Sequence, residues 1–211
     1  TVSATAATGY GFSSWSVVSG SAKIASTTSA QTYVTLTSNA TIRANATALS
    51  YRVIFNSNKP STASGSIGGS MSPQTLYWDS SDNLNSNAFT LTGWSFQGWA
   101  TSSTGSVVYN NNASVMNMIS NPAADGSSTV NLYAVWRANT ATVTFDPNGG
   151  SVSTTSKTVT YDTAYGTLPT PTYTGWAFDG WYTSASGGNL ITSTSMVRTV
   201  GDHTLFAYWS A

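Results

Sequence analysis

Gly175-Trp176-Ala177-Phe178-Asp179-Gly180-Trp181 is the most informative stretch of the sequence. Its order of glycine, large aromatic residue, Phe and final Trp recurs at 93–99 and, more loosely, at 9–15. A motif that returns along a chain is typical of proteins made of several small units, so the pattern predicts three repeats. Because aromatic side chains bury a large apolar area, we expect the motif tryptophans to fill the cores of these repeats. They are Trp15, Trp94, Trp99, Trp176 and Trp181.

Two further patterns flank this motif. The later copies are followed by a closing stretch, Leu132–Trp136 or Leu205–Trp209, whose counterpart Ile42–Ala46 ends in Ala instead of Trp. They are preceded by an opening stretch that alternates like a strand and ends in a turn, Val143–Gly150 or Val53–Asn58. The first copy is preceded by no such stretch, so we expect it to lack its opening strand.

These patterns divide the chain into three modules joined by short linkers. We expect a divergent, incomplete module at residues 1–49, a second module at 50–139 with an insertion near 59–89, and a third at 140–211. Small modules bury little surface by themselves, so contacts between neighbours are expected to add stability.

The third module gives the clearest prediction of secondary structure. Alternating apolar and polar residues indicate a sheet of about four strands, at 142–146, 157–162, 176–182 and 204–209. Residues 113–119 and 193–200 favour a helical turn instead. The predicted fold class is therefore mainly β, that is, α+β with little helix.

The composition is poor in charge. Only 7% of residues are charged, Glu is absent and the formal net charge is zero, against about 25% charged residues in ordinary soluble domains. No basic patch suggests nucleic acid, and no apolar run approaches the roughly 20 residues of a membrane-spanning helix. A neutral surface rich in Ser, Thr and Asn favours a protein outside the cell that packs, polymerises or carries sugars.

The three patterns together resemble the Listeria–Bacteroides repeat family, also called the internalin B-repeat. Residues 143–209 are similar to the family pattern from end to end, residues 53–136 are similar with an insertion, and residues 9–46 are a divergent relative. The resemblance implies tandem small β-grasp-like modules, each with a roughly four-stranded sheet. It also implies a secreted or surface-anchored bacterial or archaeal protein, and it brings no catalytic residue with it.

No group of residues predicts an active site. His203 is the only histidine, and one imidazole without neighbouring ligands does not form a metal centre. Most of the seven Asp residues stand in turn sequences, which explain them without catalysis. Asp79 and Asp82 are the closest pair, but they lack the spacing and the final Glu of a calcium loop. We therefore expect no enzyme activity, no metal and no cofactor.

Tyr77 and Trp78 are two aromatic residues outside the recurring motifs, in the insertion of the second module. Aromatic faces pack against proteins and stack on sugars, so these two residues are candidates for a ligand or subunit contact. Three triplets fit the N-glycosylation pattern, although a chain of this composition contains such triplets by chance. Their acceptors are Asn39, Asn45 and Asn112.

The missing opening strand suggests a way to assemble. An unpaired sheet edge accepts a strand from another chain, and the first residues form an extended segment suited to donation: Thr1, Val2, Ser3, Ala4 and Thr5. The sequence thus favours a non-catalytic structural or adhesive protein, on a prokaryotic cell surface or surface appendage, with a filament as its sharper form. The plainer alternative is that the first module begins further upstream.

A second hypothesis is a carbohydrate- or protein-binding module of a larger surface adhesin. The expected partners are copies of the chain, other surface proteins or glycans. Nucleic acid and membrane insertion are not expected.

Overall fold

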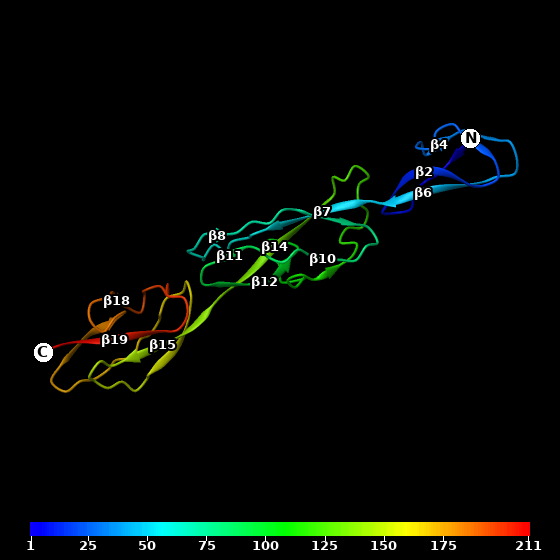
Figure 1. Cartoon of the computed structure of the whole chain (residues 1–211). Coiled ribbons are helices and arrows are strands. Elements are labelled where there is room, and N and C mark those ends of the chain that lie inside the picture. The colour runs from blue at the N-terminus through cyan, green and yellow to red at the C-terminus, as the bar shows by residue number, and fades with distance from the viewer. The chain divides into compact units, whose positions relative to one another are not determined.

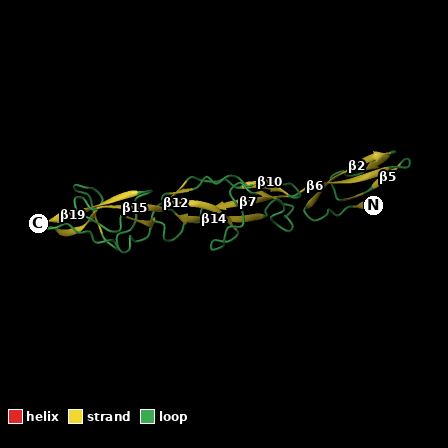
Figure 2. Cartoon of the chain, turned by 90° about the horizontal axis from the view of Figure 1, so that it is seen from below, coloured by secondary structure: helices red, strands yellow, loops and turns green.

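The computed structural model describes all residues from 1 to 211, and it consists of strands and loops (Figure 1). Figure 2 shows the same chain without any helix. The prediction of a mainly β protein is therefore confirmed, and no helix is present that would be long and apolar enough to cross a membrane.

The chain forms two compact units that do not follow the predicted module boundaries. The first comprises Thr1–Asn56, Met71–Asn87 and Trp99–Tyr133, and the second comprises Ser57–Ser70, Ala88–Gly98 and Ala134–Ala211. Because the division passes through the middle of residues 50–139, the boundaries of the three modules stay a prediction from the sequence.

Residues 1–49 form three separate antiparallel pairs instead of one sheet. The pairs are β1 (Val2–Ser3) with β4 (Gln31–Thr32), β2 (Tyr10–Ser19) with β6 (Thr41–Ala48), and β3 (Ala22–Ile24) with β5 (Val34–Leu36). Trp15 is the one large apolar side chain buried in this segment, and its indole N–H donates to the Ser29 carbonyl (3.0 Å). The segment therefore has almost no core of its own.

Residues 50–139 contain a four-stranded sheet in the order β12-β14-β7-β9. Its strands are β7 (Ser50–Asn56), β9 (Gln74–Tyr77), β12 (Trp94–Ala100) and β14 (Thr129–Ala138). The opening strand β7 runs parallel to the closing strand β14 and antiparallel to β9. Two short pairs lie outside this sheet, namely β8 (Ile67–Gly68) with β11 (Thr90–Leu91) and β10 (Asp82–Asn83) with β13 (Ser114–Val115).

Residues 140–211 repeat this arrangement in a sheet of the order β16-β15-β19-β17-β18. The strands are β15 (Thr140–Asp146), β16 (Ser156–Thr160), β17 (Ala177–Tyr182), β18 (Leu190–Ile191) and β19 (His203–Ser210). The opening strand β15 is again parallel to the closing strand β19 and antiparallel to the second strand, β16. The four strands predicted from the sequence correspond to β15, β16, β17 and β19.

The recurring Phe and final Trp form the core of both larger sheets. Alternate residues of β15 are buried, as expected when one face of a strand is covered. Phe145 and Trp181 pack with ring centroids 4.9 Å apart, and Phe55 and Trp99 do the same at 4.9 Å. All four side chains are at most 6% exposed.

The opening and closing patterns are coupled by side-chain hydrogen bonds. Asn148 has a positive φ of 48° and donates from its amide to the Ala207 carbonyl, and Asn58 (φ 45°) bonds to the Ala134 carbonyl in the same way. The closing Trp209 donates to the carbonyl of Pro147, as Trp136 does to that of Ser57. Residues 1–49 have neither an opening stretch nor this Trp, which explains their missing sheet.

The predicted helical turns at 113–119 and 193–200 are wrong. Backbone bonding to other segments replaces the helix, since Leu84 N–H donates to the Ala113 carbonyl and Asp162 N–H donates to that of Val197. Asn117 also has a positive φ of 51°, which is incompatible with a right-handed helix.

Candidate functional site at the joints between repeats

Asp162 is the most completely bonded acidic side chain of the molecule. It stands two residues after the end of β16, and its side chain is only 1% exposed. The carboxylate accepts hydrogen bonds from the Ser64 amide (3.0 Å), the Ser64 hydroxyl (2.6 Å) and the Trp94 indole N–H (2.8 Å), and it forms an ion pair with Arg198. One buried charge thus links the third repeat to two segments of the second.

Burial makes this carboxylate sensitive to its partners. A buried charge is tolerated only where hydrogen bonds or a counter-charge replace its water, and hydrogen bonds to an ionised group are stronger than neutral ones. Asp162 has both kinds of partner. Its backbone adopts a positive φ of 62°, a conformation that Asp tolerates better than most residues. The bonds to Ser64, Trp94 and Arg198 therefore all depend on an Asp side chain just after β16.

Backbone contacts complete the joint around Asn139, the residue that connects β14 to β15. Asn139 N–H donates to the Gly93 carbonyl and its carbonyl accepts from Tyr161 N–H, both at 2.9 Å. Gly93 has a positive φ of 75°, and a Cβ at this position would overlap the Tyr161 ring. The glycine of the recurring motif is therefore needed so that the next repeat can approach closely.

The first unit contains a joint with the same plan. Leu49, which connects β6 to β7, donates to the Gly9 carbonyl (2.8 Å) and accepts from Trp78 N–H (2.9 Å). Gly9 has a φ of 81°, and a Cβ there would overlap the Trp78 ring. Tyr10 donates its hydroxyl to the Asp79 carboxylate at 2.9 Å, the role that Trp94 has towards Asp162.

The two joints therefore have matching parts. We call Trp78-Asp79 and Tyr161-Asp162 the aromatic–Asp corners. In each joint, the glycine and the aromatic residue of one repeat contact the linker residue and the aromatic–Asp corner of the next repeat. Both corners follow the second strand of their sheet, β9 or β16, and both Asp residues have positive φ.

The joints differ in the exposure of the Asp. Asp79 is exposed, and besides Tyr10 its partner is Asn117, which donates to the carboxylate (2.8 Å) and accepts from the Asp79 amide (2.7 Å). The hydrogen bonds from Asn117 and then Tyr10 lower the pKa of Asp79, and the bond to the carboxylate raises the pKa of Tyr10. No ion pair like that of Arg198 accompanies Asp79.

The third copy of the glycine–aromatic pair makes no such contact. Gly175 has nothing within 4 Å of the position of a Cβ, and Trp176 is 47% exposed. The prediction that Trp176 lies in a core is therefore wrong. Trp176 precedes β17 and stacks on Tyr173, with ring centroids 5.8 Å apart at 17°. Of the five motif tryptophans, Trp94 and Trp176 take the joint position, and the others are buried: Trp15, Trp99 and Trp181.

Tyr77 and Trp78 prove to be part of the repeat, which corrects the interpretation of them as insertion residues. They end and follow β9, the counterpart of β16, so that Trp78 corresponds to Tyr161. Trp78 is engaged with Gly9, whereas Tyr77 is 55% exposed. A longer loop between β7 and β9 than between β15 and β16 hid this correspondence in the sequence.

The other predicted site residues are scattered. Val2 and Ser3 pair with β4 of the same chain, and Ala4 N–H donates to Ala30. Thr1 and Thr5 are exposed, as are Asn39 and Asn112, whereas Asn45 is half-buried and donates its amide to two serine hydroxyls. The structure brings none of these residues together with Tyr77.

No cluster of three or more His, Cys, Asp or Glu side chains suitable for a metal ion is present. His203 begins β19, where its ring contacts the Tyr165 hydroxyl (2.7 Å) and the Gly201 carbonyl (3.0 Å). Burial raises the pKa of Tyr165. Asp82 lies in β10, and its carboxylate accepts a hydrogen bond from the Asn83 amide next to it (2.8 Å).

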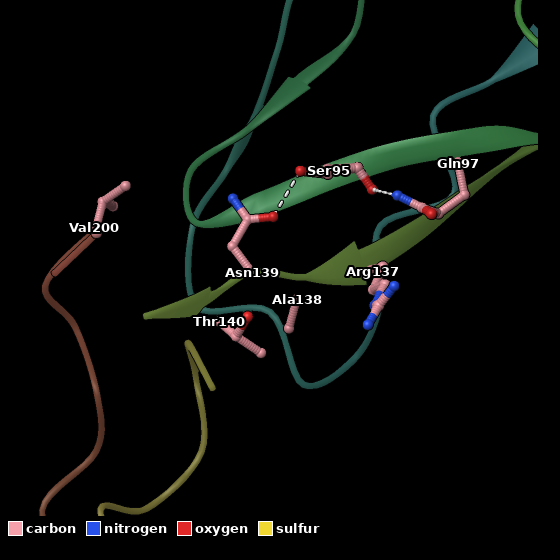
Figure 3. A pocket seen from close by; sticks show the side chains of 8 residues that line it. Ser95, Gln97, Arg137, Ala138, Asn139, Thr140 and Val200 are labelled. Carbon is pink, nitrogen blue, oxygen red and sulfur yellow. Dashed lines mark hydrogen bonds between the residues drawn. The ribbon is translucent and has the colours of Figure 1, made fainter. Parts of the chain in front are cut away.

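A surface pocket of about 480 Å³ lies beside the Asp162 joint in the second unit. Figure 3 shows Ser95 directed at Asn139, with a hydrogen bond of 2.5 Å between them, and Gln97 donating its amide to the Ser95 carbonyl; Arg137 also lines the pocket. No carboxylate or imidazole lines this pocket, so its wall offers hydrogen bonds and one positive charge, and no pair of groups for acid–base chemistry.

The chain belongs to the Listeria–Bacteroides repeat family, which confirms the resemblance inferred from the sequence. The Listeria-Bacteroides repeat domain matches residues 51–135 and 142–208, and the Divergent InlB B-repeat domain matches residues 1–48. Internalin H of Listeria monocytogenes serovar 1/2a is 31% identical over 121 residues, which cover 57% of this chain and 20% of that protein. The chain thus aligns with about a fifth of this relative's length. No solved structure gives a significant match.

Proposed function

We propose that the chain is a non-catalytic structural or adhesive segment of an extracellular surface protein, in which tandem repeats are held to one another at defined joints. The observation that carries this proposal is the recurrence of one set of joint contacts at Gly9–Asp79 and Gly93–Asp162. Kinship with internalin-like surface proteins and the charge-poor composition support it.

The joints suit such a role because they resist bending locally. A flexible linker would leave the repeats free to move, whereas here a single residue connects the closing strand to the next opening strand. Both backbone groups of that residue are hydrogen-bonded, and an Asp–aromatic bond lies beside it. Repeats coupled in this way transmit load through nearest-neighbour contacts.

The stiffness of the Asp162 joint is the property to test. The chain has no cysteine, so Gln97→Cys and Ser186→Cys introduce two unique sites for spin labels, both within the second unit. We expect a narrow distribution of label–label distances in the parent chain and a broader one after Asp162→Asn, because the variant loses the charge that Arg198 and Trp94 bind.

Asp179→Asn is the matched control, since Asp179 is exposed and bonds only to Ser210 within the same sheet. It should leave the distribution unchanged. A distribution that is equally broad in the parent and in the Asp162 variant would refute a structural role for the joint.

A filament joined by strand donation is the narrower form of this proposal. Thr1–Thr5 would have to leave β4 and pair with a neighbouring chain, because Val2 and Ser3 are paired internally. Electron microscopy of concentrated protein should then show filaments that disappear when residues 1–5 are deleted. Particles of single-chain size at all concentrations would refute the filament.

A binding module of a larger adhesin is the second candidate, and the 55% exposure of Tyr77 favours it. A groove of about 430 Å³ that includes Trp94, Phe96 and Trp136 offers a second aromatic surface. A glycan array is the direct assay. Tyr77→Ala tests a ligand contact more cleanly than Trp78→Ala, because loss of Trp78 also opens the Gly9 joint.

A further inference from the structure

Gly175 and Trp176 correspond to the glycine–aromatic pairs of the two joints, but no aromatic ring of the chain lies over Gly175. The equivalent glycines Gly9 and Gly93 are buried beneath the ring of the next repeat, whereas Gly175 is exposed. All three glycines share a positive φ, at 81°, 75° and 83°. The backbone of the third copy thus already has the conformation that the two occupied joints use.

The surroundings of this pair match the occupied joints in register. Trp209 of the closing strand corresponds to Trp136, so that Ala211 corresponds to Ala138, the residue before the linker Asn139. A residue joined behind Ala211 would stand where Asn139 and Leu49 stand in the other two joints. Its amide would then face the Gly175 carbonyl, as those of Asn139 and Leu49 face Gly93 and Gly9.

We propose that Gly175 and Trp176 are an acceptor for the aromatic–Asp corner of a further repeat of this family, joined directly behind β19. The aromatic ring of that corner covers Gly175, and its Asp accepts the indole N–H of Trp176. The ligand is thus defined by its chemistry, namely an aromatic residue followed by an Asp with positive φ at the end of a second strand.

The occupied joints favour a repeat in the same chain over a separate partner. Two of the recurring contacts are made by the linker residue, whose amide and carbonyl both bond at each joint. A separate chain does not supply that residue behind the closing strand. A sugar stacked on Trp176 would have only one ring face available, because Tyr173 lies parallel to the other at a centroid distance of 5.8 Å.

The test is a full chain to which residues 139–211 are added once more behind Ala211. The indole N–H of Trp176 is the readout, in NMR spectra assigned with Trp176→Phe. In the unextended chain this proton should exchange freely with water. In the extended chain its exchange should slow by about tenfold or more, because it then requires the joint to open.

Two variants keep the result interpretable. Asp162→Asn in the added copy alone should restore fast exchange at Trp176, and Asp162→Asn in the unextended chain should expose the Trp94 indole in the same way. Fast exchange at Trp176 in the extended chain, while Trp94 stays protected, overturns the proposal. The proposal is also overturned if the Trp94 indole stays protected after Asp162→Asn, because the occupied joint would then not depend on the Asp–indole bond.

The inference rests on the structural role proposed above, but the two fail in different experiments. If spin labels show a loose Asp162 joint, the proposed function fails. If that joint is stiff and Trp176 stays unprotected in the extended chain, only the acceptor fails. Slow exchange at Trp176 caused by glycans or by self-association of the unextended chain would assign this surface to another partner and also contradict the proposal.

Discussion

Asp162 and Asp79 occupy the same place in successive joints, but their environments differ. Asp162 is buried and bonded to Ser64, Trp94 and Arg198, whereas Asp79 is exposed and bonded to Tyr10 and Asn117. The backbone contacts of the two joints agree to within 0.1 Å. The two joints thus share their backbone contacts, and we expect burial of Asp162 to make its joint the stronger one.

The difference follows from what each repeat contributes. The loop around Ser64 covers Asp162 from the second repeat, and this loop belongs to the long connection between β7 and β9. Residues 1–49 have no such connection, so Asp79 keeps its contact with water. Water screens a charge and competes for its hydrogen bonds, so we expect the first joint to be the weaker of the two.

The largest effect is expected for Asp162→Ala. The variant leaves the Trp94 indole and the Ser64 groups without their acceptor and Arg198 without its counter-charge. We expect the free energy of unfolding to fall by about 3 kcal/mol, the lower end for a broken buried pair because Arg198 is half-exposed. Denaturant unfolding measures the loss.

Asp79→Ala is the matched variant at the other joint. It removes an exposed carboxylate with neutral partners, so the decrease in stability should be clearly smaller than for Asp162→Ala. Equal losses for the two variants would contradict the view that burial sets the strength of a joint.

Much of the fold could be predicted from the sequence, because core positions follow the alternation of strands. Phe145 stands on a strand with alternate burial, and it meets Trp181 as the recurring motif suggests. Trp94 and Trp176 could not be placed by this rule. They stand at or before the first residue of their strands, where alternation no longer determines which way a side chain points.

The joint could have been found from one further pattern. Trp78-Asp79 and Tyr161-Asp162 both place an aromatic residue before an Asp at the end of the second strand. Most Asp residues fit turn sequences when they are taken individually, without a comparison of their neighbours. The long loop between β7 and β9 also concealed the correspondence of Trp78-Asp79 with Tyr161-Asp162. Burial of Asp162 itself has no local sequence signal, since the Ser64 segment that covers it is distant in the chain.

Gly93→Ala tests the close approach in the stronger joint, with Gly175→Ala as the control. Both substitutions place a Cβ at positive φ, which strains an L-residue by similar amounts. Only Gly93→Ala also drives the Cβ into a neighbouring ring, that of Tyr161. We expect Gly93→Ala to lose about 1–3 kcal/mol more stability than Gly175→Ala, the usual cost of overpacking. Thermal unfolding of the pair measures the difference, and similar values would mean that Tyr161 moves aside easily.

The smallest effect concerns the pH dependence of the weaker joint. The pKa of Asp79 lies below its ordinary value of 3.8, because Asn117 and Tyr10 donate hydrogen bonds to the ionised carboxylate. A lowered pKa in the folded state stabilises the protein above the unfolded value, and this contribution disappears as the pH falls through the folded value. The Tyr10 contact should therefore weaken in acid, as the Asp79 carboxylate takes up a proton. An NMR titration of the Asp79 carboxyl carbon should show a raised pKa in each of two single variants, Tyr10→Phe and Asn117→Ala. The rise should be larger in Asn117→Ala. Because Asn117 is the larger cause, the opposite ranking would mean that the Tyr10 contact between repeats dominates the site and that the first joint is tighter than the exposure of Asp79 suggests.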